Sequence, residues 1–124
     1  MIQISEAEAV VMQVLWGQHP LSADEVMARL PRGNDWAEAT VKTLLNRLLN
    51  KGAIGAEKEG RRYLYTPLVE RDAWVLEESS SLIDRLFDGR VAPLVAHFSQ
   101  HQKLTRDDVA ELRKLLEGLD DEQH

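Results

Sequence analysis

The sequence predicts a mainly α-helical protein with one small β-hairpin, organised as two domains over residues 1–68 and 69–124. Three observations predict this class. Apolar residues recur at helical spacing through most of the 124 residues, and patterns typical of helix N-termini precede several of these stretches. Only after Gly52 does the hydrophobic period change to that of short strands, which confines the β-structure to one place.

Two capping boxes open the first two predicted helices. Ser5 is followed three residues later by Glu8, and Ser22 is followed in the same way by Glu25. In such a pair the serine side chain and the glutamate side chain each bind a backbone N–H of the first turn. Gly17 is expected to end the first helix, so the chain begins with two helices joined by a short connection.

The third predicted helix, over residues 37–51, has two different faces. One face is an apolar stripe at the i, i+3, i+4, i+7 spacing of a buried helix side: Val41, Leu44, Leu45, Leu48 and Leu49. The residues opposite or beside this stripe are short or basic and include no carboxylate: Thr40, Lys42, Thr43, Asn46, Arg47 and Asn50. Hydrogen-bond donors of this kind suit phosphates and base edges, so this helix is expected to enter the major groove of DNA.

A hairpin is expected directly after the third helix. Residues 53–58 and 61–66 have the pattern of two short strands, and Glu59-Gly60 between them is expected to form the tight turn. Lys58, Arg61 and Arg62 lie at or beside its tip. Three helices followed by a basic hairpin form the plan of a winged helix-turn-helix DNA-binding domain.

The distribution of charge agrees with this assignment. The net charge is −6, yet residues 1–67 hold eight basic and eight acidic side chains, so the acidity lies in the second half. Residues 42–62 alone carry six basic and two acidic side chains. Because salt screens charges beyond about 8 Å, a phosphate backbone responds to this local excess and not to the total.

The second half is expected to form a helical dimerisation domain. Helices over residues 71–88 and 91–102, and a last helix capped by Thr105, carry apolar stripes that three short helices cannot bury alone. A second copy of the chain can cover them. The residues expected at this interface are Leu82, Leu86, Phe87, Leu94, Phe98, Val109, Leu112, Leu116 and Leu119.

Several segments together resemble the penicillinase repressor family (BlaI/MecI/CopY). They are residues 4–8 with 14–16, residues 35–52 of the third helix, and residues 58–67 of the hairpin. The resemblance implies a dimeric repressor of β-lactamase and related resistance genes that occupies an operator with inverted half-sites. By matching positions, it implies base contacts for Thr40, Lys42 and Thr43, with Arg47, Lys58 and Arg61 nearer the backbone.

The resemblance also implies a route of release. In antibiotic-responsive members a membrane sensor metalloprotease cleaves the dimerisation half before a phenylalanine, and the matching bond here is His97-Phe98. This sequence has His97 where the family has asparagine, and Ala37 where the family has a serine cap, so we expect Asp35 to cap the third helix. The sequence holds no cysteine, which excludes the thiolate copper sensing of one branch of the family.

Two other functions remain open at this point. A winged helix used for protein–protein interaction would need an apolar or acidic face on the third helix, which the sequence lacks. A one-component regulator would hold a small-molecule ligand in the helical domain, but no residue pattern names such a ligand.

Enzymes, metal proteins and membrane proteins are expected to be excluded. The chain has no Gly-rich phosphate loop, and His97 and His101 lack a third metal ligand, so we expect no enzyme, cofactor or metal. No apolar run approaches the ~18 residues of a membrane span. The N-terminus has no secretory pattern, and we expect a cytoplasmic protein.

Overall fold

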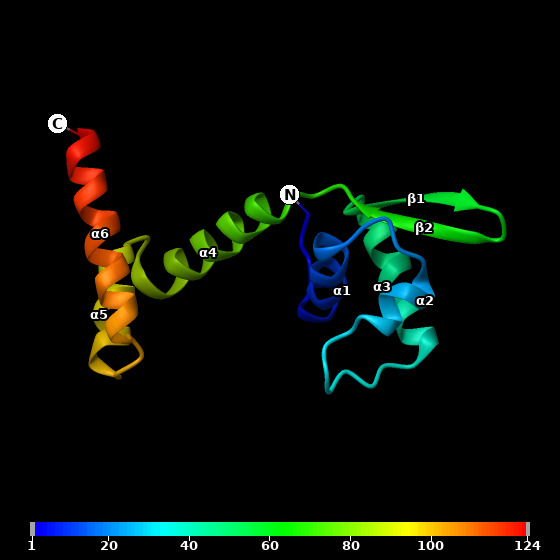
Figure 1. Ribbon diagram of the computed structural model, residues 1–124, viewed down its shortest axis with the longest axis horizontal. Helices are drawn as coiled ribbons and strands as arrows, with labels where there is room; N and C mark the ends of the chain where they lie inside the picture. The colour runs from blue at the N-terminus through cyan, green and yellow to red at the C-terminus, as the bar shows by residue number, and fades with distance from the viewer. Residues whose placement is uncertain (1, 124) are drawn as a thin grey trace. The chain divides into compact units, whose positions relative to one another are not determined.

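The computed structural model describes residues 2–123 and confirms a mainly helical chain with one antiparallel hairpin (Figure 1). Within these residues the elements follow the expected order. Their bounds are α1 Glu6–Gly17, α2 Ala23–Ala28, α3 Glu38–Lys51, β1 Ile54–Glu59, β2 Arg62–Pro67, α4 Arg71–Phe87, α5 Val91–Gln100 and α6 Arg106–Gln123. No helix among the described residues is both long and apolar enough to cross a lipid bilayer.

The chain divides into two compact units, the first ending at Val75 and the second beginning at Leu76. The first unit therefore includes the start of α4 as well as the predicted winged-helix segment. Trp74 of α4 packs on Trp16 of α1, with ring centroids 5.3 Å apart, and the Trp16 indole N–H donates to the Val69 carbonyl at 2.8 Å. These contacts explain why this unit extends beyond residue 68.

Both predicted capping boxes are present. The Ser5 hydroxyl accepts from the Glu8 N–H at 3.1 Å, and the Glu8 carboxylate accepts from the Ser5 N–H at 2.8 Å. The same two bonds join Ser22 and Glu25, at 3.2 and 3.0 Å. Each pair satisfies backbone donors that a helix N-terminus otherwise leaves free, so α1 and α2 begin where the sequence predicts.

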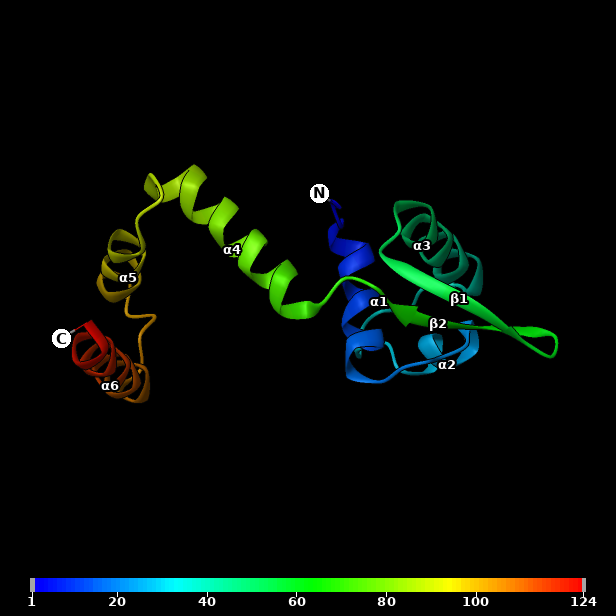
Figure 2. The ribbon, with the colours of Figure 1, turned by 90° about the horizontal axis from the view of Figure 1, so that it is seen from above.

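The core of the first unit lies between α1, α2, α3 and the hairpin (Figure 2). The apolar stripe of α3 is buried as predicted, apart from Leu49, which is half-buried. The buried hydrophobic residues are Ile4, Val11, Met12, Leu15, Leu21, Val26, Val41, Leu44, Leu45, Leu48, Ala53 and Ile54. Burial of this stripe fixes which side of α3 remains exposed.

The hairpin register differs by one residue from the prediction. Glu59 pairs with Arg62, so the turn consists of Gly60 and Arg61 and not of Glu59-Gly60. Gly60 has φ 63°, the conformation that a two-residue hairpin loop with glycine first requires. Leu21, before α2, pairs with Tyr65 of β2 through backbone bonds of 3.1 and 2.7 Å, which ties the hairpin to the helices.

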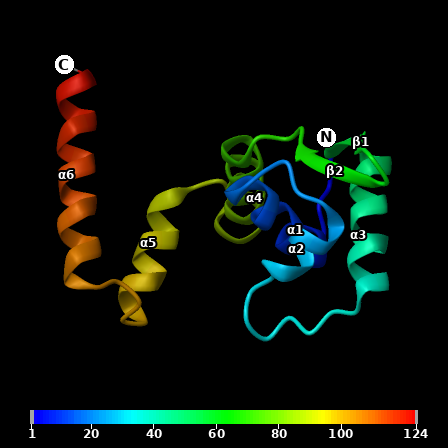
Figure 3. The same ribbon diagram turned by 45° about the vertical axis from the view of Figure 1, so that its right-hand side comes forward.

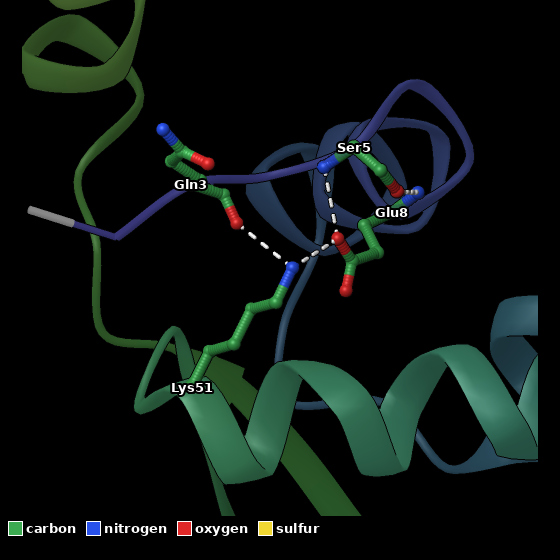
Figure 4. A network of polar contacts seen from close by, with 4 residues as sticks. All are labelled: Gln3, Ser5, Glu8 and Lys51. Carbon is green, nitrogen blue, oxygen red and sulfur yellow. Dashed lines mark hydrogen bonds and ion pairs between the residues drawn. The ribbon is translucent and has the colours of Figure 1, made fainter.

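A polar network joins α1 to the last residue of α3 (Figure 4). Glu8 is 1% exposed, and its carboxylate oxygen Oε1 lies 2.5 Å from Lys51 Nζ, which also donates to the Gln3 carbonyl at 2.8 Å. Burial raises the pKa of Glu8, but hydrogen bonds from Lys51 and from Ser5 outweigh it and lower the pKa below 4.5. The network therefore stabilises the charged carboxylate inside the first unit.

The second unit has no such core. Among residues 76–121, every side chain is exposed or half-buried. α4 and α5 end earlier than predicted, at Phe87 and Gln100, and the connection after α4 contains Asp88 at φ 52° and Gly89 at φ 77°. Thr105 and Asp108 exchange two hydrogen bonds of 3.0 Å at the start of α6, as the sequence predicts.

Candidate nucleic-acid interface

The outer side of α3 is free along its length (Figure 3). α3 packs against α1 and α2 through its buried stripe, which turns the predicted contact residues outward. All eight residues predicted to bind DNA are exposed: Thr40, Lys42, Thr43, Asn46, Arg47, Lys58, Arg61 and Arg62. The fold thus leaves these side chains accessible on α3 and on the hairpin.

Three of these residues share a shallow hollow of about 270 Å³ on α3. It is lined by Ala39, Thr40, Thr43, Leu44 and Arg47. The Thr43 hydroxyl donates to the Ala39 carbonyl one turn earlier, at 2.9 Å. Ala39 was not among the predicted contact residues, although its spacing from Thr43 already placed both on one helix side.

A second hollow of about 360 Å³ lies where α2, the start of α3 and the hairpin approach one another. Lys42, Arg61 and Arg62 line it together with acidic side chains. The full lining is Ser22, Ala23, Asp24, Glu25, Glu38, Lys42, Arg61, Arg62, Tyr63 and Tyr65. Asn46 and Lys58 line neither hollow, so the predicted residues form two groups with two residues outside them.

Carboxylates pair with two of the predicted contact residues. Lys42 Nζ lies 2.9 Å from Glu38 Oε1, and this hydrogen bond raises the pKa of Lys42. Arg62 lies 3.7 Å from one carboxylate oxygen of Glu25 and 3.7 Å from one of Glu59. The sequence prediction did not include these acidic residues. Two of the pairs are nevertheless visible in the sequence, because Glu38 and Lys42 are four residues apart in a helix and Glu59 and Arg62 flank the hairpin turn.

The local positive charge is therefore smaller than the sequence count indicates. Lys51 contributes to that count, yet its ammonium group is bound to buried Glu8. Within the described residues, the ion pairs leave three basic side chains near this surface without a carboxylate partner: Arg47, Lys58 and Arg61. These three remain available for phosphate contacts without the loss of an existing ion pair.

The cap expected at the start of α3 is absent. Ala37 is the N-cap residue, and no side chain makes a cap hydrogen bond there, so the expectation that Asp35 would do so was wrong. The Ala37 carbonyl instead accepts from the Thr40 and Val41 N–H groups, at 3.0 and 3.2 Å. The first N–H groups of α3 thus have no side-chain acceptor at the cap.

The predicted dimerisation residues lie on exposed or half-buried positions of the second unit. Six of them are at least 36% exposed: Leu82, Leu86, Phe98, Val109, Leu116 and Leu119. Phe87, Leu94 and Leu112 are half-buried. Leu76, Val91 and Leu115 are also exposed, at 58–69%, and the prediction did not include them, although their apolar character and helical setting were visible in the sequence.

The predicted cleavage bond, His97-Phe98, lies inside α5. The His97 carbonyl, which belongs to this bond, accepts a backbone hydrogen bond from His101 at 3.2 Å, and the Phe98 carbonyl of the next peptide accepts one from Lys103 at 2.9 Å. The centroid of the His97 ring lies 6.2 Å from that of Phe87 and 4.6 Å from that of His101. Across residues 2–121, no three His, Asp or Glu side chains gather as metal ligands.

Comparison with known proteins gives one consistent result. A family model described as penicillinase repressor matches residues 4–118. The penicillinase repressor of Bacillus licheniformis is 34% identical over 93% of this chain and 90% of its own length. The methicillin resistance regulatory protein MecI of Staphylococcus aureus N315 is 32% identical over 92% of this chain and 93% of its own.

A solved structure is also similar to this chain. It contains the monomeric form of Bacillus licheniformis BlaI in complex with the blaP half-operator, and it is 40% identical to this chain. The match covers 58% of this chain and 89% of that one, with a TM-score of 0.50. The family match, in contrast, spans both units.

Proposed function

The chain belongs to the penicillinase repressor family, and we propose that it acts as a cytoplasmic homodimer on an inverted-repeat operator in double-stranded DNA. The family consists of DNA-binding transcriptional repressors with a winged-helix fold, so the predictions of fold, of repressor function and of no enzyme activity are confirmed. A winged helix used for protein–protein interaction and a small-molecule ligand in the helical domain are not favoured. The operator, the dimer and the contact residues are the parts proposed here.

The observation that carries the proposal is the exposed side of α3. Its buried stripe leaves Thr40, Thr43 and Arg47 on one accessible surface, and the hairpin adds Lys58 and Arg61 as basic side chains without a carboxylate partner among the described residues. A recognition helix in the major groove with a basic wing at the neighbouring backbone uses these residue types. Lys42, Asn46 and Arg62 complete the proposed interface.

The exposed leucines of the second unit support the dimer. Leu82, Leu86, Leu116 and Leu119 are 39–66% exposed, more apolar surface than three solvated helices usually present. A twofold pair would present two α3 helices about one duplex turn apart, roughly 34–36 Å, and would therefore read an inverted repeat. Genes for resistance to β-lactam antibiotics are the proposed targets.

Release by cleavage is the second part of the proposal. A membrane sensor metalloprotease would cut the His97-Phe98 bond, whose side chains are exposed. Proteases bind extended segments, so the end of α5 must open first, with loss of the hydrogen bonds that these carbonyl groups accept. An inducing β-lactam should then yield a fragment that begins at Phe98, detectable by mass spectrometry of the chain from cells. An intact chain under induction would exclude this route.

The experiment for the operator uses the full chain and a duplex selected from a random pool. If about six to ten phosphates are neutralised per dimer, affinity should fall by roughly 10³–10⁵ between 50 and 200 mM salt. Arg47→Ala should weaken binding to all duplexes and lower the salt slope by about one. A selected duplex without an inverted repeat, or affinity that does not depend on salt, would contradict the proposal.

A further inference from the structure

Two histidines lie together at the end of α5. His97 and His101 are four residues apart, which places both rings on one side of the helix. Their ring centroids are 4.6 Å apart, and both side chains are exposed. The rings therefore form a close pair that dissolved ions can reach.

This geometry suits two imidazoles that share one metal ion. Zinc binds an imidazole nitrogen at about 2.0–2.1 Å and arranges its ligands at tetrahedral angles, which places two such rings with centroids roughly 5 Å apart. The observed pair is close to this separation. The two rings are inclined at 54° and are not stacked in parallel, so a nitrogen of each can turn toward a common point.

We propose that His97 and His101 bind one divalent transition-metal ion, Cu²⁺, Ni²⁺ or Zn²⁺, through one ring nitrogen each. Imidazole is a preferred ligand of these ions, whereas Mg²⁺ and Ca²⁺ prefer oxygen. Across residues 2–121 no third His, Asp or Glu side chain joins the pair, so water completes the coordination. The sequence predicted no metal for want of that third ligand; a two-ligand site instead holds an ion that exchanges with the solvent.

The charge of the second unit favours a cation. Residues 76–124 hold eleven acidic and six basic side chains, a net charge of −5. A negative field of this kind raises the local concentration of positive ions without a carboxylate having to touch the ion.

The turn that carries the two rings is closed by backbone hydrogen bonds. The His97 carbonyl accepts from the His101 N–H at 3.2 Å. One residue further on, the Phe98 carbonyl accepts from the Lys103 N–H at 2.9 Å. Gln102 has φ 58°, at the position where helix ends of this type usually have glycine. Because this backbone conformation is unfavourable for a residue with a side chain, the end of α5 opens more readily than a glycine-capped end.

A bound ion would keep this turn closed, because it needs both rings on the same side of the helix. When the end of α5 opens, the rings separate and the ion retains one ligand. The ion therefore favours the closed helix by the ratio of its affinities for two rings and for one. We expect a ratio of about tenfold, since the second ring binds in an intramolecular step.

The consequence for release rests on the proposed function. Cleavage of the His97-Phe98 bond requires the end of α5 to open, so a metal-loaded chain should be cleaved more slowly than a metal-free chain. The ion would then set how readily the repressor is inactivated.

The first experiment measures binding of Cu²⁺ to the full chain by isothermal titration calorimetry, because Cu²⁺ binds tightest in this series of ions. We expect one ion per chain and an affinity about tenfold lower in His101→Gln. His19→Gln is the control. His19 lies in the first unit, where its Nδ1 is 2.8 Å from the Leu15 carbonyl, and its loss should leave this binding unchanged. Mg²⁺ should show no binding that His101→Gln abolishes.

A spacing variant separates the geometry of the pair from the number of histidines. His101→Gln combined with Gln102→His keeps the number but moves one ring away from His97 around the helix. This double variant should bind Cu²⁺ as weakly as His101→Gln alone. Circular dichroism melts verify that the variants are folded.

The second experiment measures opening of the helix end by amide hydrogen exchange, read by NMR with and without Zn²⁺. Saturating Zn²⁺ should slow exchange of the His101 and Lys103 N–H groups about tenfold, the same factor as the binding ratio. The Val109 N–H, which bonds to the Thr105 carbonyl in α6, should not respond. In His101→Gln the Lys103 N–H should not respond either.

The outcomes that overturn the inference differ from those that overturn the proposed function. Equally tight Cu²⁺ binding in the wild-type chain and in His101→Gln would refute the site. Binding that depends on both histidines without slower exchange would refute the closure of α5 and its effect on cleavage. A chain that selects no operator, or that stays intact under induction, would remove the role in release and leave the metal site standing.

Discussion

The two units of the chain differ in how far their apolar side chains are buried. In the first unit Leu15, Leu45 and Leu48 are fully buried, whereas in the second unit Leu86 and Leu116 are more than half exposed. Both units are built from amphipathic helices with similar residues. The difference teaches that the first unit completes its own core and that the second requires another surface to do so.

The reason lies in how many elements surround each core. In the first unit α1, α2 and the hairpin pack against α3, and the Leu21–Tyr65 bridge ties the hairpin to the segment before α2. The second unit has only the rest of α4 together with α5 and α6, and a unit of this size buries too small a share of its surface to be stable by itself. In the proposed dimer, a twofold partner would supply the missing layer.

The largest expected effect comes from placing a charge on the exposed stripe of α6. Leu116→Asp should dissociate the proposed dimer, because an unpaired carboxylate would be buried at the interface. Affinity for the two-half-site duplex should then fall by about 10²–10⁴-fold, the gain normally supplied by linked binding. Analytical ultracentrifugation and a binding titration measure the two effects.

Ala110→Asp is the matched control for this change. Ala110 lies in the same helix, on the side opposite the stripe, and is exposed. The same added charge there should leave both the dimer and the affinity unchanged. A Leu116→Asp chain that remains dimeric and binds DNA tightly would contradict the inference that the second unit needs a partner to cover its apolar side chains.

An intermediate effect is expected from the polar network of the first unit. Glu8→Gln keeps the capping box but removes the charge that pairs with Lys51. Loss of one partner of a buried pair costs 3–5 kcal/mol, and because Lys51 is 37% exposed we expect about 2 kcal/mol at pH 7. Thermal melts followed by circular dichroism measure the change in stability.

The same variant has a signature in pH. Glu8 has its pKa lowered in the folded chain, so its contribution to stability is fully present above about pH 4.5 and is lost as pH falls through the folded pKa. The stability of the wild-type chain should therefore decrease more steeply below pH 4.5 than that of Glu8→Gln. Glu25→Gln, in the more exposed second capping box, is the control and should cost less stability than Glu8→Gln. Equal losses of stability in Glu8→Gln and Glu25→Gln would show that the pairing of Glu8 with Lys51 adds no stability.

The smallest effect is expected within the proposed interface. Glu38→Gln removes the carboxylate that holds Lys42 and repels phosphate, so affinity for the selected duplex should rise about twofold at low salt. Fluorescence anisotropy with a labelled duplex resolves a change of this size. A fall in affinity would mean that the Glu38 carboxylate accepts a hydrogen bond from a base.

Local patterns predicted most of the fold, and contacts between distant residues account for what they missed. The capping serines and the stripe of α3 follow from spacing within one element, and they are confirmed. The pairing of Glu8 with Lys51 and of Glu25 with Arg62 joins residues on separate elements, which periodicity cannot identify. The one-residue shift of the hairpin turn arose because a glycine can occupy either central position of a tight turn.

For the proposed interface, the sequence predicted which residues are exposed better than it predicted the local positive charge. The five predicted contact residues on α3 are exposed because the opposite face of that helix is apolar, and an apolar face is visible in the sequence. The partners of Lys42 and Arg62 decide how much positive charge remains, and one of them comes from α2. Counting charges along the chain could not include that carboxylate.

The packing of Trp16 on Trp74 has a practical consequence. All three tryptophans of the chain, at positions 16, 36 and 74, lie in the first unit, and two of them have ring centroids 5.3 Å apart. Intrinsic tryptophan emission therefore reports on the first unit alone, because the second unit contains no tryptophan. A change in tryptophan emission on heating would mark the unfolding of the first unit, and circular dichroism over the same temperatures would show whether the second unit unfolds separately.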